Sequence, residues 1–138
     1  MVVLDQLTKH WALNALDDDH VIDVLGSLRF NLAFNKGMAF SSGDWLGPAI
    51  PFLAIGVAVF LLVSVKRSGA SRWFATAVGL VIGGSVGNVV DRLFRNDGWF
   101  DGAVVDFIDL QWWPIFNVAD IGIVIGGGIL LVLMLRAP

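Results

Sequence analysis

Long stretches of apolar residues, separated by short polar segments, dominate the hydropathy pattern of this chain. Residues 46–65 form a run of 20 residues without a charge. Two further runs of 18 residues lie within 73–92 and 118–135, and Asp120 is the only charge in the second. A helix rises about 1.5 Å per residue and the hydrocarbon core of a bilayer is about 30 Å thick. The pattern therefore predicts membrane spans at these three places, and residues 1–16 indicate the end of a fourth.

Basic residues set the expected orientation of these spans. The connection 66–72 contains three of the nine basic residues and is the most basic short loop of the chain. Short basic loops stay in the cytoplasm, so we expect both chain ends inside and the connections 17–44 and 93–116 outside. Those two connections hold nine of the twelve aspartates. The pattern thus places the candidate chemistry at the extracytoplasmic face of a multi-pass protein.

One outer segment alternates in the manner of a strand rather than a helix. Within residues 25–40, large apolar side chains alternate with polar or small ones from Leu28 to Asn35, which is the period of a half-buried strand. The expected fold class is all-α and integral to the membrane: a four-helix transmembrane bundle with a small extracytoplasmic β element. We expect residues 1–138 to form a single domain.

Composition supports a membrane protein and excludes several kinds of site. The chain is 57% hydrophobic and 15% charged, with a mean hydropathy of +0.77, whereas soluble domains carry about 25% charged residues. It has no cysteine, which excludes disulfides, thiol catalysis and zinc thiolate sites. Its two histidines argue against a His-rich metal site. The lack of a run of Lys and Arg argues against nucleic-acid binding.

Two aspartates occupy positions where a charge is costly. Asp120 lies near the start of the apolar run 118–135, and there it is either functional or a cap on the helix N-terminus, two readings that its own position leaves evenly balanced. Asp106 lies in the apolar run 104–108 of an outer loop, where a solvated charge is hard to justify. If that loop folds over the membrane edge, the two carboxyls can share one proton. Such a pair performs aspartic peptidase chemistry, which requires no metal or cofactor.

A third polar group lies at the outer end of the predicted span 73–92. Asn88, Asp91 and Arg92 are spaced i, i+3 and i+4 and share one helix face. An ion pair between Asp91 and Arg92 favours structural support and substrate contact over catalysis. Residues 83–87 match the serine hydrolase pattern G-x-S-x-G, but that nucleophile requires a strand–turn–helix context and a histidine base. The match lies inside a predicted span, so we interpret its glycines as packing residues.

The main alternative is a small membrane carrier or channel subunit that uses its aspartates as a proton or cation relay. A relay of that kind requires acidic groups through the depth of the membrane, whereas the aspartates here cluster at one border. A non-catalytic assembly factor held by its glycine-rich helix faces does not account for Asp106. A cleavage assay run beside an ion-flux assay distinguishes the peptidase from the relay.

Five sequence blocks, in order along the chain, carry a resemblance to a known family. They are Asp5-Gln6-Leu7-Thr8-Lys9, Asn35 to Ser41, Gly83 to Arg92, Val105-Asp106-Phe107, and Phe116 to Asp120. Together they resemble the lipoprotein signal peptidases (signal peptidase II), bacterial membrane aspartic peptidases that cut signal peptides from prolipoproteins. Each block alone is modest support, but the ordered set spans nearly the whole chain and is highly specific.

The resemblance implies roles for ten residues. Asp106 and Asp120 match the catalytic pair. The positions that match residues supporting this pair or contacting the substrate are Asn35, Gly37, Asn88, Asp91, Arg92, Asn117, Asp5 and Lys9. The implied substrate is a prolipoprotein whose lipobox cysteine carries a diacylglycerol, cut just before that cysteine at the outer face of the bacterial inner membrane. The resemblance also implies inhibition by globomycin, and we expect a monomer in contact with membrane lipid.

The first block departs from the family in its place along the chain. In the family it lies toward the outer end of a complete first span, whereas here Asp5 is the fourth residue after Met1. The sequence therefore indicates a chain shortened at its N-terminus relative to the family.

Overall fold

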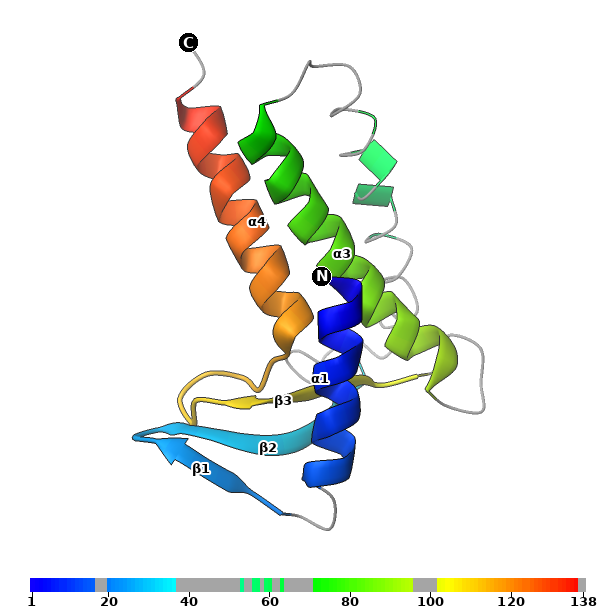
Figure 1. Cartoon of the computed structure of the whole chain (residues 1–138), viewed down its shortest axis with the longest axis vertical. Helices are drawn as coiled ribbons and strands as arrows, with labels where there is room; N and C mark the ends of the chain where they lie inside the picture. Colours follow the sequence, from blue (N-terminus) through cyan, green and yellow to red (C-terminus); the bar gives the residue numbers. More distant parts are fainter. Residues whose placement is uncertain are drawn as a thin grey trace.

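The computed structural model describes residues 1–16, 20–36, 71–95 and 102–136, together with six separate helical positions between residues 53 and 63. The elements follow in the order α1 (Val2–Ala15), β1 (Ile22–Leu25), β2 (Leu28–Asn35), α3 (Arg72–Phe94), β3 (Val104–Asp109) and α4 (Val118–Leu135). Helices α3 and α4 lie side by side along the long axis, and the sheet lies across one end of this pair (Figure 1).

The sheet makes the expected all-α four-helix bundle wrong. Three helices and a three-stranded antiparallel sheet are the elements of the described residues, and two of these helices, α3 and α4, are long and apolar enough to cross a membrane. The sequence pattern predicts a loop at Val104–Asp109, but these residues form strand β3. Five of the six are buried, so apolar and polar residues do not alternate along β3 as they do along a half-buried strand. The predicted span 46–65 lies outside the described residues apart from the six helical positions.

Strand β2 is the central strand and pairs antiparallel with both neighbours. It covers the eight residues in which the sequence alternates. The tight turn between β1 and β2 contains Gly26 at a φ of 58°, a left-handed conformation that glycine adopts without strain. In the register between β2 and β3, Ala33 lies opposite Asp106 and Asn35 lies opposite Val104. The register therefore brings the end of β2 alongside Asp106.

Helix α1 joins the membrane helices to the sheet. Near its C-terminal end, Ala12 and Leu16 are buried against Phe107 of β3. The ring of Trp11 meets that of Phe30 edge to face, with 5.2 Å between the centroids. The N-terminal half of α1 contacts α3 and α4 instead, because Asp5 reaches the backbone of α4. The helix therefore fixes the sheet relative to the ends of α3 and α4.

Helices α3 and α4 approach each other closely at two glycines. A Cβ atom added to Gly84 would lie 2.4 Å from the carbonyl oxygen of Ala119, and one added to Gly126 would lie 2.6 Å from that of Ala77. Small residues at such crossings let helix backbones meet in lipid. Because Ala119 precedes Asp120, the crossing at Gly84 also sets the position of that carboxylate.

Candidate active site

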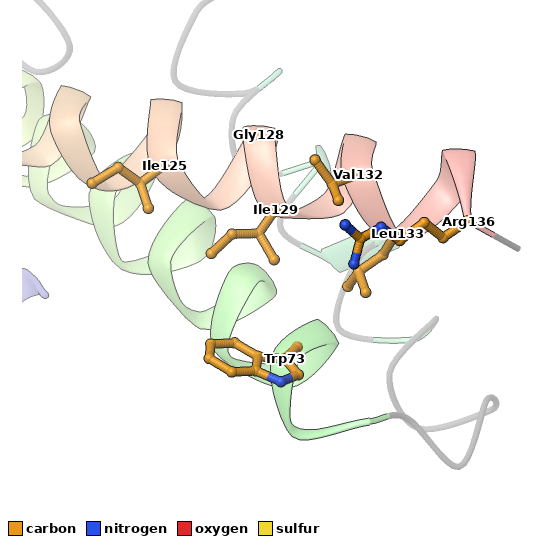
Figure 2. Close-up of a pocket in the computed structure, with 7 residues that line it drawn as sticks. All are labelled: Trp73, Ile125, Gly128, Ile129, Val132, Leu133 and Arg136. Carbon is orange, nitrogen blue, oxygen red and sulfur yellow. The ribbon is translucent and has the colours of Figure 1, made fainter.

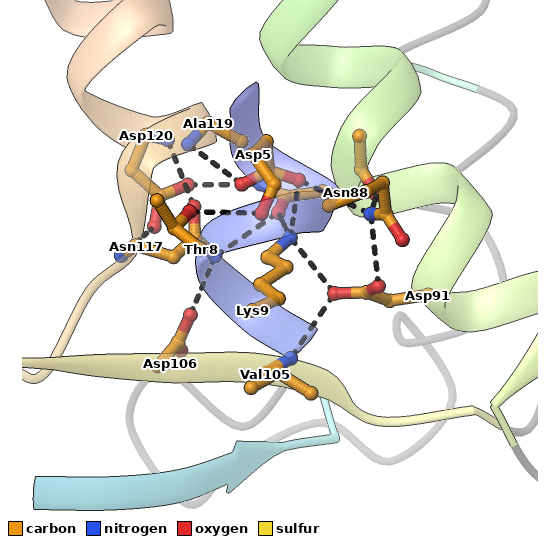
Figure 3. Close-up of polar contacts among 12 residues, drawn as sticks. Asp5, Thr8, Lys9, Asn88, Asp91, Val105, Asp106, Asn117, Ala119 and Asp120 are labelled. Carbon is orange, nitrogen blue, oxygen red and sulfur yellow. Dashed lines mark hydrogen bonds and ion pairs between the residues drawn. The ribbon is translucent and has the colours of Figure 1, made fainter. Parts of the chain in front are cut away.

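A group of polar side chains lies where α1, α3, β3 and α4 meet (Figure 3). We call it the polar junction, and its members are Asp5, Lys9, Asn88, Asp91, Asp106, Asn117 and Asp120. Within the described residues, no buried side-chain nitrogen or oxygen lacks a hydrogen-bond partner. The junction is therefore a satisfied polar network at the end of an otherwise apolar helix pair.

Asp120 lies in the first turn of α4, where it takes part in a capping box. The side-chain oxygen of Asn117 accepts a hydrogen bond from the backbone N–H of Asp120 at 3.0 Å, and Asp120 Oδ2 accepts one from the backbone N–H of Asn117 at 3.1 Å. The other carboxylate oxygen, Oδ1, accepts a hydrogen bond from Asn88 Nδ2 at 2.9 Å. Asp120 therefore caps its helix, which is one of the two readings left open by the sequence, and also faces the junction. The functional reading stays a prediction.

Asp106 lies on β3 and is only 2% exposed. Its Oδ1 accepts a hydrogen bond from Asn117 Nδ2 at 2.6 Å. Burial and then the charge of Asp120 raise the pKa of Asp106 to about 6, although hydrogen bonds from Asn35 and Asn117 and the charge of Lys9 lower it. The two carboxyl groups are thus electrostatically coupled, as groups that share a proton must be.

Lys9 is fully buried at the centre of the junction. Its ammonium forms ion pairs of 2.8 Å with both Asp5 and Asp91 and donates a hydrogen bond of 2.9 Å to Asn88 Oδ1. A buried ammonium needs such partners because desolvation of an unpaired charge costs several kcal/mol. Lys9 therefore ties α1 to α3 within the junction.

The carboxylates around Lys9 also hold the backbone of the two elements that carry the candidate pair. Asp5 Oδ1 accepts a hydrogen bond from the Ala119 amide at 3.0 Å, next to Asp120. Asp91 Oδ2 accepts one from the Val105 amide at 3.2 Å, next to Asp106. The positions of the two candidate carboxyls thus depend on side chains far away in sequence.

Asp91 has other partners than the one expected from the sequence. Its ion pairs are with Lys9 and Arg95 rather than with its neighbour Arg92. On a helix, residues four apart lie on one face, whereas adjacent residues diverge. Arg92 is buried and is close enough to Asp106 to interact with it electrostatically. Gln6 is a further member of this network that the sequence pattern does not single out. It donates hydrogen bonds to Asp91 and to the carbonyl of Gly87.

Of the ten residues expected at the site, Gly37 lies outside the described residues and the structure brings the other nine together. Asn35 reaches the site through its hydrogen bond to Asp106.

Asp109 is a charged group that the sequence pattern does not single out. Burial opposes its ionisation, but an ion pair of 2.7 Å with Arg29 and a hydrogen bond from the Gln111 amide lower its pKa on balance. Within the described residues, no three His, Cys, Asp or Glu side chains are grouped closely enough to hold a metal ion.

An apolar groove of about 430 Å³ opens beside the junction. Asp120 is its one charged lining residue among the described positions, and Trp112, Trp113 and Phe116 line it on the sheet side. It continues along the outward face of α4, where Val124 is 72% exposed. The groove therefore connects a candidate catalytic carboxylate with a surface suited to lipid.

A second hollow, of about 420 Å³, lies toward the other end of α3 and α4 (Figure 2). Its lining is apolar apart from Arg136, and Trp73 closes one side. No member of the polar junction lines it. We therefore place the candidate active site at the junction and not in this hollow.

Comparison with known proteins assigns the chain to a family. A family model described as Signal peptidase (SPase) II matches residues 1–136. The chain belongs to the signal peptidase II family. This confirms the resemblance seen in the five sequence blocks. Together with the two apolar helices of spanning length, it identifies the chain as a membrane protein and a peptidase.

Individual relatives and structures agree with this family. A lipoprotein signal peptidase of Rhodococcus jostii (strain RHA1) is 40% identical over 136 residues, which cover 98% of this chain and 68% of the relative. One of Mycobacterium avium (strain 104) is 38% identical over 135 residues, which cover 97% and 73%. Two solved bacterial membrane enzymes share the fold at 25% identity, with TM-scores of 0.84 and 0.81. The matches cover 98% of this chain and 82% of the first enzyme, and 99% and 88% for the second.

Proposed function

We propose that this chain is a membrane aspartic endopeptidase that removes signal peptides from prolipoproteins, with Asp106 and Asp120 as the catalytic pair. The observation that carries the proposal is that Asn117 donates hydrogen bonds to both carboxyls, from Nδ2 to Asp106 at 2.6 Å and from its backbone N–H to Asp120 at 3.1 Å, beside an apolar groove. The relatives are lipoprotein signal peptidases, which supports prolipoproteins as the substrate class. In this proposal, residues 1–138 act as one membrane-embedded peptidase domain.

The charges around the pair support a shared proton. The carboxylates there are Asp5, Asp91, Asp106 and Asp120, and the cations are Lys9, Arg92 and Arg95. One proton held between Asp106 and Asp120 would balance the four carboxylates against the three cations. Buried groups of net charge near zero avoid the large desolvation cost of an unpaired ion.

The proposed reaction begins when one carboxylate takes a proton from water as the water oxygen bonds to the scissile carbonyl carbon. The other carboxyl group donates its proton to the carbonyl oxygen, which gives a neutral gem-diol. The carbon–nitrogen bond then breaks, and the leaving nitrogen takes the proton that the first carboxyl acquired. The second carboxylate recovers its proton from a gem-diol hydroxyl, which becomes the carbonyl of the new carboxyl end. The cycle returns both groups to their initial states and consumes one water.

The groove beside Asp120 suits the lipid part of the substrate. In our proposal an acyl chain of the diacylglyceryl-modified lipobox cysteine lies along Trp113 and Val124, so that the peptide bond just before the cysteine reaches Asp120. Burial of an acyl chain contributes about 0.8 kcal/mol per CH₂ group. Trp112 and Trp113 are largely exposed, as side chains at a membrane–water border are. The proposed site therefore lies at the extracytoplasmic border of the inner membrane, in a multi-pass monomer surrounded by lipid.

The alternative of a proton or cation relay is less well supported. The acidic residues of α3 and α4, Asp91 and Asp120, both lie at the junction end, and after Asp120 the helix α4 has no charged residue. A relay across the membrane would need acidic groups further along the same helices. Asp106 and Asp120 instead lie at one end of the helix pair, where Asp120 lines the apolar groove.

The test is cleavage of a lipid-modified prolipoprotein by purified protein in proteoliposomes. We expect Asp106→Asn and Asp120→Asn each to lower the rate by at least about a thousandfold, because neither variant can complete both proton transfers. Asp23→Asn, at an exposed position of β1, is the control and should cleave like the parent. Near-parental cleavage by either active-site variant would disprove the catalytic pair. A proton or cation flux that is lost in both variants, without cleavage by the parent, would favour the relay.

A further inference from the structure

The orientation of the Asn88 side chain is decided by its neighbours. An asparagine amide can turn by half a rotation without changing shape, so its partners determine where its oxygen and its NH₂ group point. Asn88 Oδ1 lies 2.9 Å from the ammonium of Lys9. Because an ammonium only donates hydrogen bonds, the oxygen of Asn88 must face Lys9. Its NH₂ group is thereby directed to Asp120 Oδ1, at 2.9 Å.

Asn117 is held in one orientation in the same way. Its oxygen accepts the backbone N–H of Asp120, so its NH₂ group must point away from α4. There it donates to Asp106 Oδ1 at 2.6 Å and to Asn88 Oδ1 at 3.0 Å. If Asn88 were turned, three donors from Lys9, Asn117 and Asn88 would meet without an acceptor. The two amides are therefore locked together, and Lys9 is the charged group that locks Asn88.

The locked amides give the two carboxyls unequal surroundings. Both oxygens of Asp120 accept N–H hydrogen bonds, and the group lies in the first turn of α4, where the helix dipole favours negative charge. Asp106 also accepts hydrogen bonds, from Asn35 and from the N-cap residue Asn117, but it lies on a strand outside the first turn of α4 and is almost completely buried. Burial favours the uncharged form of a carboxyl, whereas donated hydrogen bonds favour the charged form.

We propose that Lys9, acting through Asn88, is a positioning residue that keeps Asp120 as the ionised member of the pair and leaves the shared proton on Asp106. This inference rests on the proposed function and adds the roles within it. Asp120 takes the proton from water, and Asp106 protonates the scissile carbonyl oxygen. The raised pKa of Asp106 agrees with this division.

The hydrogen-bonded path from Lys9 through Asn88 to Asp120, which we call the Lys9–Asn88 relay, is distinct from the direct electrostatic field of Lys9. The charged groups that face the pair are Lys9 and Asp5 from α1 and Asp91 and Arg92 from α3. The charge of Lys9 also favours ionisation of Asp106, so its field alone does not distinguish the two carboxyls. Of the two ways in which Lys9 can act on the pair, only the hydrogen bond that it orients on Asn88 is directed at Asp120 alone. A variant that keeps Lys9 and breaks this bond therefore separates the relay from the field.

The first experiment compares Asp5→Asn/Lys9→Met with Asp5→Asn in the full-length protein. The double variant removes one buried cation and one buried anion together, and the single variant keeps the relay. We expect kcat of the double variant to fall about tenfold to a hundredfold below that of Asp5→Asn, with KM within about twofold. The acid limb of its pH profile should move to higher pH, because the ionised base has lost a donor. If the double variant has the same kcat and the same acid limb as Asp5→Asn, the Lys9–Asn88 relay is overturned, while cleavage would still support the proposed function.

The second experiment uses Asn88→Leu, which is close to asparagine in size and adds no charge but cannot donate to Asp120. Lys9 is kept and retains its ion pairs with Asp5 and Asp91. The variant should show the same fall in kcat and the same shift of the acid limb, even if the Lys9 variant fails to fold. Parental kcat in folded Asn88→Leu would overturn the inference. In either case, near-parental cleavage by both Asp106→Asn and Asp120→Asn would be the separate failure of the proposed function.

Infrared spectroscopy locates the shared proton directly. The protonated-carboxyl band that appears as the pH falls from 7 to 5 should be lost in Asp106→Asn. In Asp120→Asn it should persist and appear at lower pH, since the charge that raises the pKa of Asp106 is gone. A band that is kept in Asp106→Asn and lost in Asp120→Asn would place the proton on the other carboxyl and refute the assignment.

Discussion

The polar junction and the α3–α4 helix pair are neighbouring regions held together by different forces. In the junction, hydrogen bonds and ion pairs join groups up to 114 residues apart, as between the backbone N–H of Ala119 and the carboxylate of Asp5. In the helix pair, small residues such as Gly84 and Gly126 allow close contact of the backbones. The junction is therefore sensitive to the identity of each polar atom, whereas the helix pair is sensitive to volume.

This difference suits the two regions to different tasks. Directional bonds, with no unsatisfied buried side-chain group in the described part of the chain, fix the orientation of the two carboxyls, as the proposed catalysis requires. Close packing at Gly84 fixes the distance of α4 from α3 without specifying any polar orientation. The helix pair therefore sets where Asp120 lies, and the junction sets which way it and Asp106 point.

The largest effect on stability is expected from Asp91→Asn. Asp91 is fully buried and is bonded to Lys9, Arg95 and the Val105 amide. Loss of its charge leaves the buried ammonium of Lys9 with less compensation, which should lower the free energy of unfolding by about 3 kcal/mol. We expect this loss in the free energy of unfolding to be at least as large as the loss in activity when that loss is also expressed as a free energy, with both measured in detergent. A stable and folded but wholly inactive Asp91→Asn protein would instead make Asp91 part of the chemistry.

A matched pair of glycine substitutions tests the helix pair. A Cβ on Gly84 would collide with the carbonyl of Ala119, whereas one on Gly79 has nothing within 4 Å. We expect Gly84→Ala to destabilise the protein by about 2 kcal/mol. Gly79→Ala should be neutral or stabilising by up to about 1 kcal/mol, because alanine favours a helix. Thermal unfolding of both variants measures the difference, and equal effects would show that the crossing at Gly84 is not tight.

The helix pair could be predicted from sequence, and the sheet only in part. The length of the apolar runs alone predicted α3 and α4, whose bounds in the structure are Arg72–Phe94 and Val118–Leu135. The alternation in β2 was also recognisable, because its two faces differ. Strand β3 has no such difference, so its burial on both faces concealed it. The all-α expectation failed for this reason.

The members of the polar junction could be recognised from sequence, but their partners could not. Sequence spacing favoured an ion pair between Asp91 and Arg92, whereas helix geometry directs Asp91 to Arg95, four residues on. The bond from Lys9 to Asn88 joins residues 79 apart in the chain, a proximity that depends on the packing of α1 against α3. Charge type and burial cost thus indicate which residues need partners, while the fold decides which partners they have.

The smallest effect we predict is a gain in stability from Asp106→Asn that depends on pH. The pKa of Asp106 is about 6 in the folded protein, above its ordinary value of 3.8. Above pH 6 the folded state therefore holds an unfavourable buried carboxylate, whereas below about pH 4 both the folded and the unfolded states are protonated. The variant should raise the free energy of unfolding by on the order of 1 kcal/mol at pH 8 and by much less at pH 4. A gain that is equal at both pH values, or a loss at pH 8, would show that the ionised Asp106 is well accommodated, and would place it with the structural carboxylates of the junction.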